Sequence, residues 1–319
     1  MKTNNKNTHE YHMRKRTYLE FFGFSVLALL TYLQWNTIQI AIIEIKQSES
    51  VYIWLAIALY WILLPITAVS YRLLSDKRLI IKTTTLAQLA GSGPGRIIPG
   101  GLGRLSFSVI HLIKLGFSSA HAIIVTVTNN IIGIIVNISV LIIVIFFEPD
   151  IKLLIKSETL IPTTLVLVFM TLIGFSLFQW MLHAKRTRNS TLKLTRKWHV
   201  QIKYIIKKPI LVIELFSLAM LILVGGVGIL LLCSLALGVN ITVSDAIIGL
   251  SVGVFIGGVL PTPGGVGGVE AGIASTFVFL GFSPTESASV ALLFRAITYW
   301  QPLIPGTIAY FYLRKRKLL

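Results

Sequence analysis

Long apolar runs separated by short polar segments dominate this chain of 319 residues. Runs of about 18 residues or more are long enough to cross a bilayer as α-helices. The runs do not alternate apolar and polar residues in the period-2 pattern of a membrane β-barrel. The pattern therefore predicts an all-α, polytopic integral membrane protein.

The runs predict about six full spans and two pairs of short helices. Full spans are expected at about 18–35, 51–74, 119–147, 160–182, 209–237 and 284–313, with kinks at Pro65, Pro302 and Pro305. The short pairs are 79–90 with 102–115, and 243–260 with 268–280. Two helix starts are explicit, because Thr242 with Asp245 and Ser283 with Glu286 have the spacing of a capping box. The short helices are expected either to dip into the membrane and return or to cross it fully.

A Gly/Pro-rich break separates the two helices of each short pair. The breaks read IIPGGLG at 97–103 and PTPGGVGG at 261–268, and an apolar run and the tripeptide GFS follow each one. This repetition predicts an internal repeat within a single transmembrane domain, with halves at about 51–147 and 209–313 around a basic loop at 183–208. Paired interruptions in two halves mark a candidate transport site. The alternative is that the glycines only let helices pack closely.

Charge is concentrated beside the apolar runs. The chain is 55% hydrophobic and 13% charged, with a formal net charge of +17. Most of its 29 Lys and Arg residues lie before residue 17 and in segments 72–82, 185–208 and 314–317. The positive-inside rule accounts for this distribution, so nucleic acid is not a predicted partner. We expect a multi-pass plasma-membrane protein with both termini in the cytoplasm, whose two halves are inverted relative to each other if the short helices are re-entrant.

Ionisable residues within apolar segments are costly and usually face a cavity or a partner. Glu270 follows the second break and Arg295 lies within the last span, so they are expected to interact, either at a transport site or as a structural ion pair. Arg96 and Arg104 flank the first break and are expected to face a phosphate or to snorkel to the cytoplasmic surface. Asn130 aligns with Arg295 in the repeat, which suggests a shared cavity lining or an interhelical hydrogen bond.

The backbone of the breaks completes the candidate translocation site. A helix that starts after a break points amide groups toward it, and such an end suits a phosphate or carboxylate. The full candidate set is Glu270, Arg295, Pro263, Gly264, Gly265, Gly267, Pro99, Gly100, Gly101, Gly103, Arg96, Arg104 and Asn130.

Catalytic motifs are absent from the sequence. It contains no HExxH, no GxSxG with partners and no Walker-type GxxxxGK[ST]. Its one cysteine, Cys233, excludes an internal disulfide and a cysteine metal cluster. We therefore expect a protein that is not an enzyme and that needs no cofactor or metal.

The second half closely resembles the C-terminal signature of the lysylphosphatidylglycerol synthase transmembrane-region family, also called flippase-like proteins. The stretches that carry the resemblance are LPTPGGVGGVEAG, LGFSPTESASVALLFRAITYW and PLIPG. The first half, with YRLL, IIPGGLG and GFSSAHAIIVTVTNN, is more loosely similar. Glu270 and Arg295 fall on the Glu and Arg of the family pattern, whereas Arg104 stands where relatives often carry an acid.

The resemblance implies the membrane part of the family without its soluble aminoacyltransferase domain. The implied function is a flippase-like lipid transporter. Its partners would be membrane lipids: an anionic or aminoacylated phospholipid such as aminoacyl-phosphatidylglycerol, or a polyprenyl- or glycan-linked lipid. The alternative is a non-transporting membrane protein that anchors or regulates a separate lipid or glycan transferase through the loop at 183–208.

Overall fold

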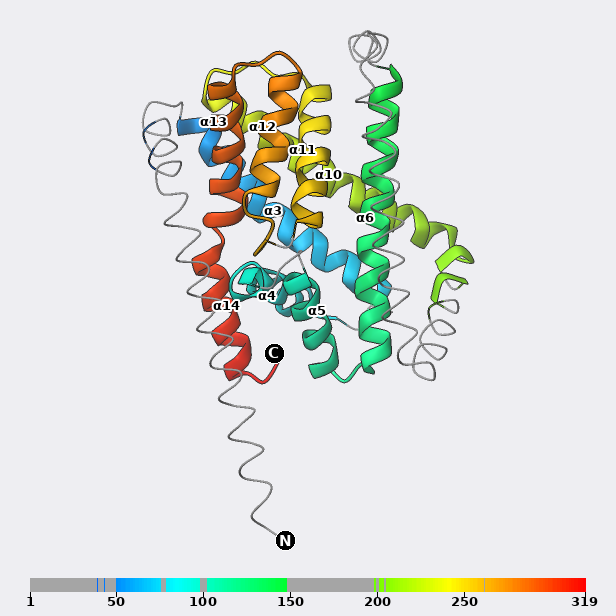
Figure 1. Cartoon of the computed structure of the whole chain (residues 1–319). Helices are drawn as coiled ribbons and strands as arrows, with labels where there is room; N and C mark the ends of the chain where they lie inside the picture. Colours follow the sequence, from blue (N-terminus) through cyan, green and yellow to red (C-terminus); the bar gives the residue numbers. More distant parts are fainter. Residues whose placement is uncertain are drawn as a thin grey trace.

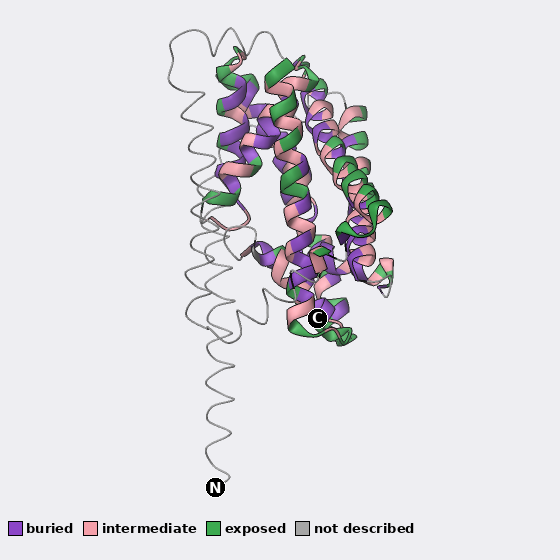
Figure 2. Cartoon of the chain, turned by 90° about the vertical axis from the view of Figure 1, so that its right-hand side faces the viewer, coloured by how far each residue is buried: buried purple, intermediate pink, exposed green. Residues whose placement is uncertain are grey.

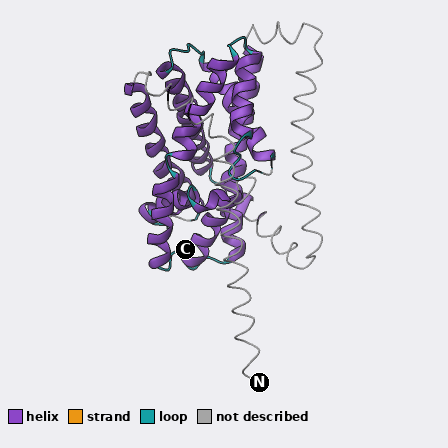
Figure 3. Ribbon diagram, turned by 60° about the vertical axis from the view of Figure 1, so that its left-hand side comes forward, coloured by secondary structure: helices purple, strands orange, loops and turns teal. Residues whose placement is uncertain are grey.

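The computed structural model describes residues 50–75, 79–97, 102–147, 201–203, 205–260 and 262–319, together with Gln39, Ile43 and Trp198. Within these residues every regular element is a helix (Figure 3). Three helices are long and apolar enough to cross a membrane: α3 (Ser50–Leu74), α6 (Ser119–Phe147) and α10 (Pro209–Ala236). The predicted all-α class is confirmed for this part of the chain. The predicted spans at 18–35 and 160–182 lie outside the described residues, as does most of the basic loop.

Two helical hairpins contain the breaks. The first hairpin consists of α4 (Ile81–Gly91), the 3₁₀-helix η1 (Pro94–Ile97) and α5 (Leu102–Lys114). The second hairpin consists of α11 (Val243–Val259) and α12 (Gly268–Phe279). These bounds agree with the short helices predicted from the sequence.

The last predicted span is a broken helix made of three pieces: α13 (Pro284–Arg295), the π-helix η2 (Ala296–Trp300) and α14 (Leu303–Lys315). The break thus begins before Pro302 and includes the turn around it. Capping boxes start α11 and α13, because the side chains of Thr242 and Ser283 accept from the backbone N–H groups of Asp245 and Glu286. Both predicted helix starts are confirmed.

The hairpins occupy opposite parts of the molecule (Figure 1). The second hairpin and α13 lie in the upper part, and the first hairpin and α14 lie in the lower part. Helices α3 and α10 pack along each other, and α6 packs against α5, α10 and α11. The loops that lead into α6 and α13 lie at opposite ends of the bundle, so the chain leaves the two hairpins at opposite ends.

The outward faces of the long helices are apolar. On α6, large exposed side chains include Ile134, Ile135, Ile142, Ile143, Phe146 and Phe147. Figure 2 shows that buried residues face the interior of the bundle while exposed ones line its outer faces and ends. Contiguous apolar surface of this kind suits contact with lipid tails.

Glycines hold the second hairpin closed. A Cβ atom at Gly272 would lie 2.7 Å from the Cα of Gly253, and one at Gly268 would lie 2.9 Å from the Cα of Gly257. Helices in membranes associate through small residues that let backbones touch. The turn between the helices also requires glycine, because Gly264 and Gly265 have positive φ angles of 59° and 72°. These contacts fix where α12 begins and therefore where Glu270 lies.

Candidate functional site

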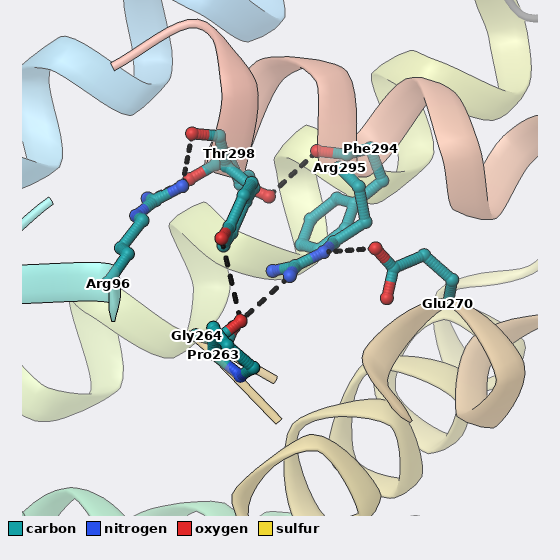
Figure 4. Close-up of polar contacts among 8 residues, drawn as sticks. Arg96, Pro263, Gly264, Glu270, Phe294, Arg295 and Thr298 are labelled. Atoms are coloured by element: carbon teal, nitrogen blue, oxygen red, sulfur yellow. Dashed lines mark hydrogen bonds and ion pairs between the residues drawn. The ribbon is translucent and has the colours of Figure 1, made fainter. Parts of the chain in front are cut away.

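Side chains and backbone of both hairpins meet the broken helix at and just before its π-helix (Figure 4). Arg96 reaches η2 from the first hairpin, and Glu270 and the carbonyl of Gly264 reach Arg295 from the second. Residues about 200 positions apart in the chain are therefore brought together, since Arg96 contacts Thr298 across a separation of 202 residues. We call Arg96, Glu270, Arg295 and Tyr299 the charged hub.

The π-helix supplies backbone acceptors to the hub. Its hydrogen bond from the N–H of Gln301 to the carbonyl of Ala296, at 2.8 Å, spans five residues instead of four. Pro302 has no N–H group to donate to the carbonyl of Thr298, which an ordinary α-helix would require. The carbonyls of Thr298 and Tyr299 instead accept from Arg96, and the bond from Nη2 to Thr298 measures 2.7 Å.

Arg295 and Glu270 form a buried ion pair. Nε of Arg295 donates to Oε1 of Glu270 at 3.0 Å, and Nη2 donates to the carbonyl of Gly264 at 3.2 Å. Both residues are buried, with exposed fractions of 7% and 8%. The contact predicted from the sequence is present. Oε2 of Glu270 is buried and has no hydrogen-bond partner among the described residues.

Tyr299 links the two arginines. The Cζ atoms of Arg96 and Arg295 lie 4.1 Å and 4.4 Å from the centroid of its ring, which is the geometry of a cation–π contact. Its hydroxyl donates to the carbonyl of Pro263 at 3.5 Å, so this one side chain contacts Arg96, beside the first break, and Pro263, in the second. Sequence reasoning missed Tyr299. Its position four residues after Arg295, one helical turn away, was the signal that could have found it.

The hub carries more positive than negative charge. Arg96 and Arg295 are both buried, and Glu270 is the buried acid of the described residues. A charge at the bilayer centre costs roughly 2.5–3.5 kcal/mol on insertion scales, so three such groups in one place indicate a functional site. Asp245 and Glu286 instead cap helices at exposed positions.

The other predicted site residues lie in different surroundings. Arg104 is exposed and donates to Oγ of Ser92 at 3.1 Å, within the first hairpin. Asn130 is half-buried on α6 and donates to the carbonyl of Thr126 at 2.8 Å, within its own helix. A Cβ atom at Gly103 would meet the carbonyl of Gly95, so this glycine serves close packing.

The second break contributes backbone directly to the hub. Pro263 and Gly264 contribute carbonyls to the hub, Gly265 packs against Gly257, and Gly267 precedes the first residue of α12 with a φ angle of 81°. The predicted site residues Pro99, Gly100 and Gly101 lie outside the described residues. In the part of the chain that the structure covers, no group of three His, Cys, Asp or Glu side chains is placed to hold a metal ion.

The family model described as lysylphosphatidylglycerol synthase TM region matches residues 21–306. The chain belongs to this family. The match includes both breaks and every residue of the charged hub, as the family resemblance of the sequence predicted. No curated protein and no solved structure matches the chain. The charged hub therefore lies within the region that matches the family.

Proposed function

We propose that this family member is a flippase-like transporter that moves a polar-headed lipid between the two leaflets of the plasma membrane. The cargo is an aminoacyl-phosphatidylglycerol or another anionic, polyprenyl- or glycan-linked lipid. The observation that carries the proposal is that both interrupted hairpins contribute residues to one buried charged hub. Irregular backbone and buried charge are both costly in a membrane, and their combination is typical of a substrate pathway.

The arrangement of the hairpins supports an inverted repeat of two re-entrant hairpins among six full spans. The first hairpin lies in the lower part of the bundle and the second in the upper part (Figure 1), and Arg96 of the first and Gly264 of the second contact Thr298 and Arg295 of the broken helix. Transporters with inverted repeats place their substrate sites where such interrupted helices meet. With both termini and the loop at 183–208 in the cytoplasm, the first hairpin enters from the cytoplasmic side and the second from the outer side.

Side-specific labelling tests this topology. The single native cysteine, Cys233, is fully buried, so exposed cysteines introduced as S118C and T285C can be labelled with little background. We expect an impermeant maleimide added outside intact cells to label T285C and to leave S118C unlabelled. Labelling of both positions from the same side would contradict the inverted arrangement.

The residues of the hub suggest how a lipid head group is bound. The first N–H groups of α12 follow Gly267 and point toward the second break, which suits a lipid phosphate. Glu270 has one oxygen on Arg295 and one free, so it either meets a cationic part of the head group or gates the path through its bond to Arg295. No covalent chemistry is involved, and we propose a transporter and not an enzyme.

Translocation by the purified full chain in proteoliposomes tests the proposal. Accessibility of fluorescent phosphatidylglycerol and of its lysylated form to a membrane-impermeant quencher is compared with that in empty vesicles. We expect protein-dependent translocation and its loss in Glu270→Gln, which keeps the size of the side chain and removes its charge. Glu286→Gln is the matched control, because that carboxylate is an exposed helix cap.

Two outcomes would redirect the proposal. Unchanged translocation by a folded Glu270→Gln variant would remove Glu270 from the mechanism. Folded wild-type protein that moves neither lipid, nor a polyprenyl phosphate probe, would favour the alternative function of a membrane partner for a separate lipid or glycan transferase.

A further inference from the structure

The charged hub has an unbalanced positive charge. Glu270 neutralises Arg295 through their ion pair, whereas the recorded contacts of the Arg96 guanidinium are with neutral groups: two backbone carbonyls and the face of Tyr299. The only buried acid in the described part of the chain is Glu270, so the described residues offer Arg96 no carboxylate of its own. A buried guanidinium satisfied by carbonyls alone is a group with capacity for an anion.

Two unused hydroxyl groups lie on chain segments that adjoin the hub. Oη of Tyr60 and Oγ1 of Thr262 are buried and have no hydrogen-bond partner among the described residues. Tyr60 lies on α3, which packs against η2. Thr262 precedes Pro263, whose carbonyl receives the Tyr299 hydroxyl. Both hydroxyls can donate to a phosphate oxygen.

A phosphate is a stronger partner for Arg96 than the carbonyls it now holds. The planar guanidinium donates two parallel bonds to phosphate, and such charge-assisted pairs are roughly twice as strong as bonds to neutral acceptors. A lipid phosphate that reaches the hub would therefore take the place of the carbonyls of Thr298 and Tyr299. That exchange removes a contact that joins the first hairpin to the broken helix.

We propose that the hub selects lipids whose head group carries a net negative charge, and that Arg96 determines this preference. The proposal rests on the transport function proposed above and names its cargo class as a lipid phosphate without a compensating cation. The free Oε2 of Glu270 offers one acceptor to an ammonium group. A lysylated head group would nevertheless place its extra positive charge beside two guanidinium groups, which like-charge repulsion disfavours.

Ligand-induced thermal stabilisation of the full chain in a neutral detergent measures binding separately from transport. The probes are short-chain phosphatidylglycerol, its lysylated form, phosphatidylcholine and inorganic phosphate. We expect phosphatidylglycerol to bind about tenfold more tightly than the lysylated and zwitterionic lipids. Stabilisation by inorganic phosphate at comparable concentration would identify the bare anion as sufficient, and its absence would show that the acyl chains contribute.

Variants assign the preference to Arg96. Arg96→Gln is expected to lose the preference for phosphatidylglycerol. Arg96→Lys keeps the positive charge but lacks the planar guanidinium, so it is expected to retain part of the preference. Lys114→Met is the control, because Lys114 is an exposed cation on the same hairpin. If Arg96→Gln does not fold, the lipid preference of Arg96→Lys is compared with that of wild type instead.

The outcomes separate this inference from the transport proposal. Equal or tighter binding of the lysylated lipid by wild type would overturn the charge preference, even if that lipid is translocated. Binding of phosphatidylglycerol that is unchanged in both Arg96 variants would overturn the role of Arg96. Selective, Arg96-dependent binding without any translocation would support the anion site and contradict transport.

Discussion

The two hairpins share an order of elements but differ in what joins their helices. In the second hairpin, α11 and α12 touch through backbone at Gly253 with Gly272 and at Gly257 with Gly268. In the first, the glycine contact of Gly95 with Gly103 lies at the tip, and the body is held by a side-chain hydrogen bond of 3.0 Å from Gln88 to Ser108. The second hairpin is therefore joined by glycine contacts between backbones, whereas the first combines close glycine contacts at Gly91 and Gly95 with a buried side-chain hydrogen bond.

The hairpins also contribute opposite charges to the hub. The second supplies Glu270, which pairs with Arg295 on the neighbouring helix α13. The first supplies Arg96, which binds carbonyls of η2 without a carboxylate. The second hairpin and α13 thus form a charge-neutral pair, whereas Arg96 of the first hairpin contacts η2 through bonds that, under the inference above, an anionic ligand replaces.

The largest expected loss of stability comes from breaking the ion pair between Arg295 and Glu270. Arg295→Met leaves the Glu270 carboxylate buried without its partner, and breaking a buried ion pair in this way costs about 3–5 kcal/mol. Arg96→Met leaves only neutral carbonyls unsatisfied, which costs about 1–3 kcal/mol. The free energy of unfolding, measured by SDS titration in mixed micelles, is expected to fall further for Arg295→Met.

A double variant checks the cause of that difference. Arg295→Met combined with Glu270→Gln removes the uncompensated charge and should recover a large part of the lost stability. Equal losses for Arg295→Met and Arg96→Met, or no recovery in the double variant, would show that the two arginines play the same structural role.

Much of this arrangement was predictable because its signals are local. Proline and glycine fix where short helices stop, and the capping residues Thr242 and Ser283 fix where two helices start. The contact of Glu270 with Arg295 was predictable because α12 and α13 are consecutive helices joined by a short turn.

The rest of the hub depends on contacts that local sequence does not encode. Arg96 meets η2 only because the two hairpins pack from opposite ends, and the π-helix exists where Pro302 withdraws a donor and Arg96 occupies the free carbonyls. Tyr299 lies one helical turn after Arg295, and that spacing alone does not say that its ring also contacts Arg96. The alignment of Asn130 with Arg295 did not predict its contacts, because the hydrogen bond of Asn130 stays within α6.

A second, smaller effect tests the glycine packing of the second hairpin. Gly272→Val places a branched side chain against the backbone of Gly253, which cannot move without separating α11 from α12. Overpacking of this kind costs about 1–3 kcal/mol, and we expect the upper part of that range because the obstructing atoms are backbone. The same SDS titration measures the loss.

Gly258→Val is the matched control for this change. Gly258 lies on α11, and a Cβ atom there would meet nothing within 4 Å. We expect its variant to remain close to wild type in stability. A similar loss in both variants would mean that glycine is needed in this hairpin for reasons other than close contact of the helices.

The smallest expected effect concerns the helix starts, where the hairpins differ again. Helix α11 has the capping box of Thr242, whereas Ile80 at the N-cap of α4 has extended backbone angles and makes no side-chain cap bond. Thr242→Ala should cost about 1 kcal/mol, the usual value of an N-cap. Ile80→Ser should stabilise by a similar amount, because Ile80 is 66% exposed and a serine hydroxyl can accept from the N–H of Thr83.

The control for this last change is Ile110→Ser, which replaces an exposed isoleucine within α5 and adds no cap. If Ile80→Ser and Ile110→Ser change the free energy of unfolding equally, the gain does not come from capping. A gain in stability that is specific to Ile80→Ser would show that the missing side-chain cap of α4 makes the first hairpin less stable. Under the proposed transport function, slower lipid translocation in the same variant would indicate that movement at the start of α4 is part of the transport cycle.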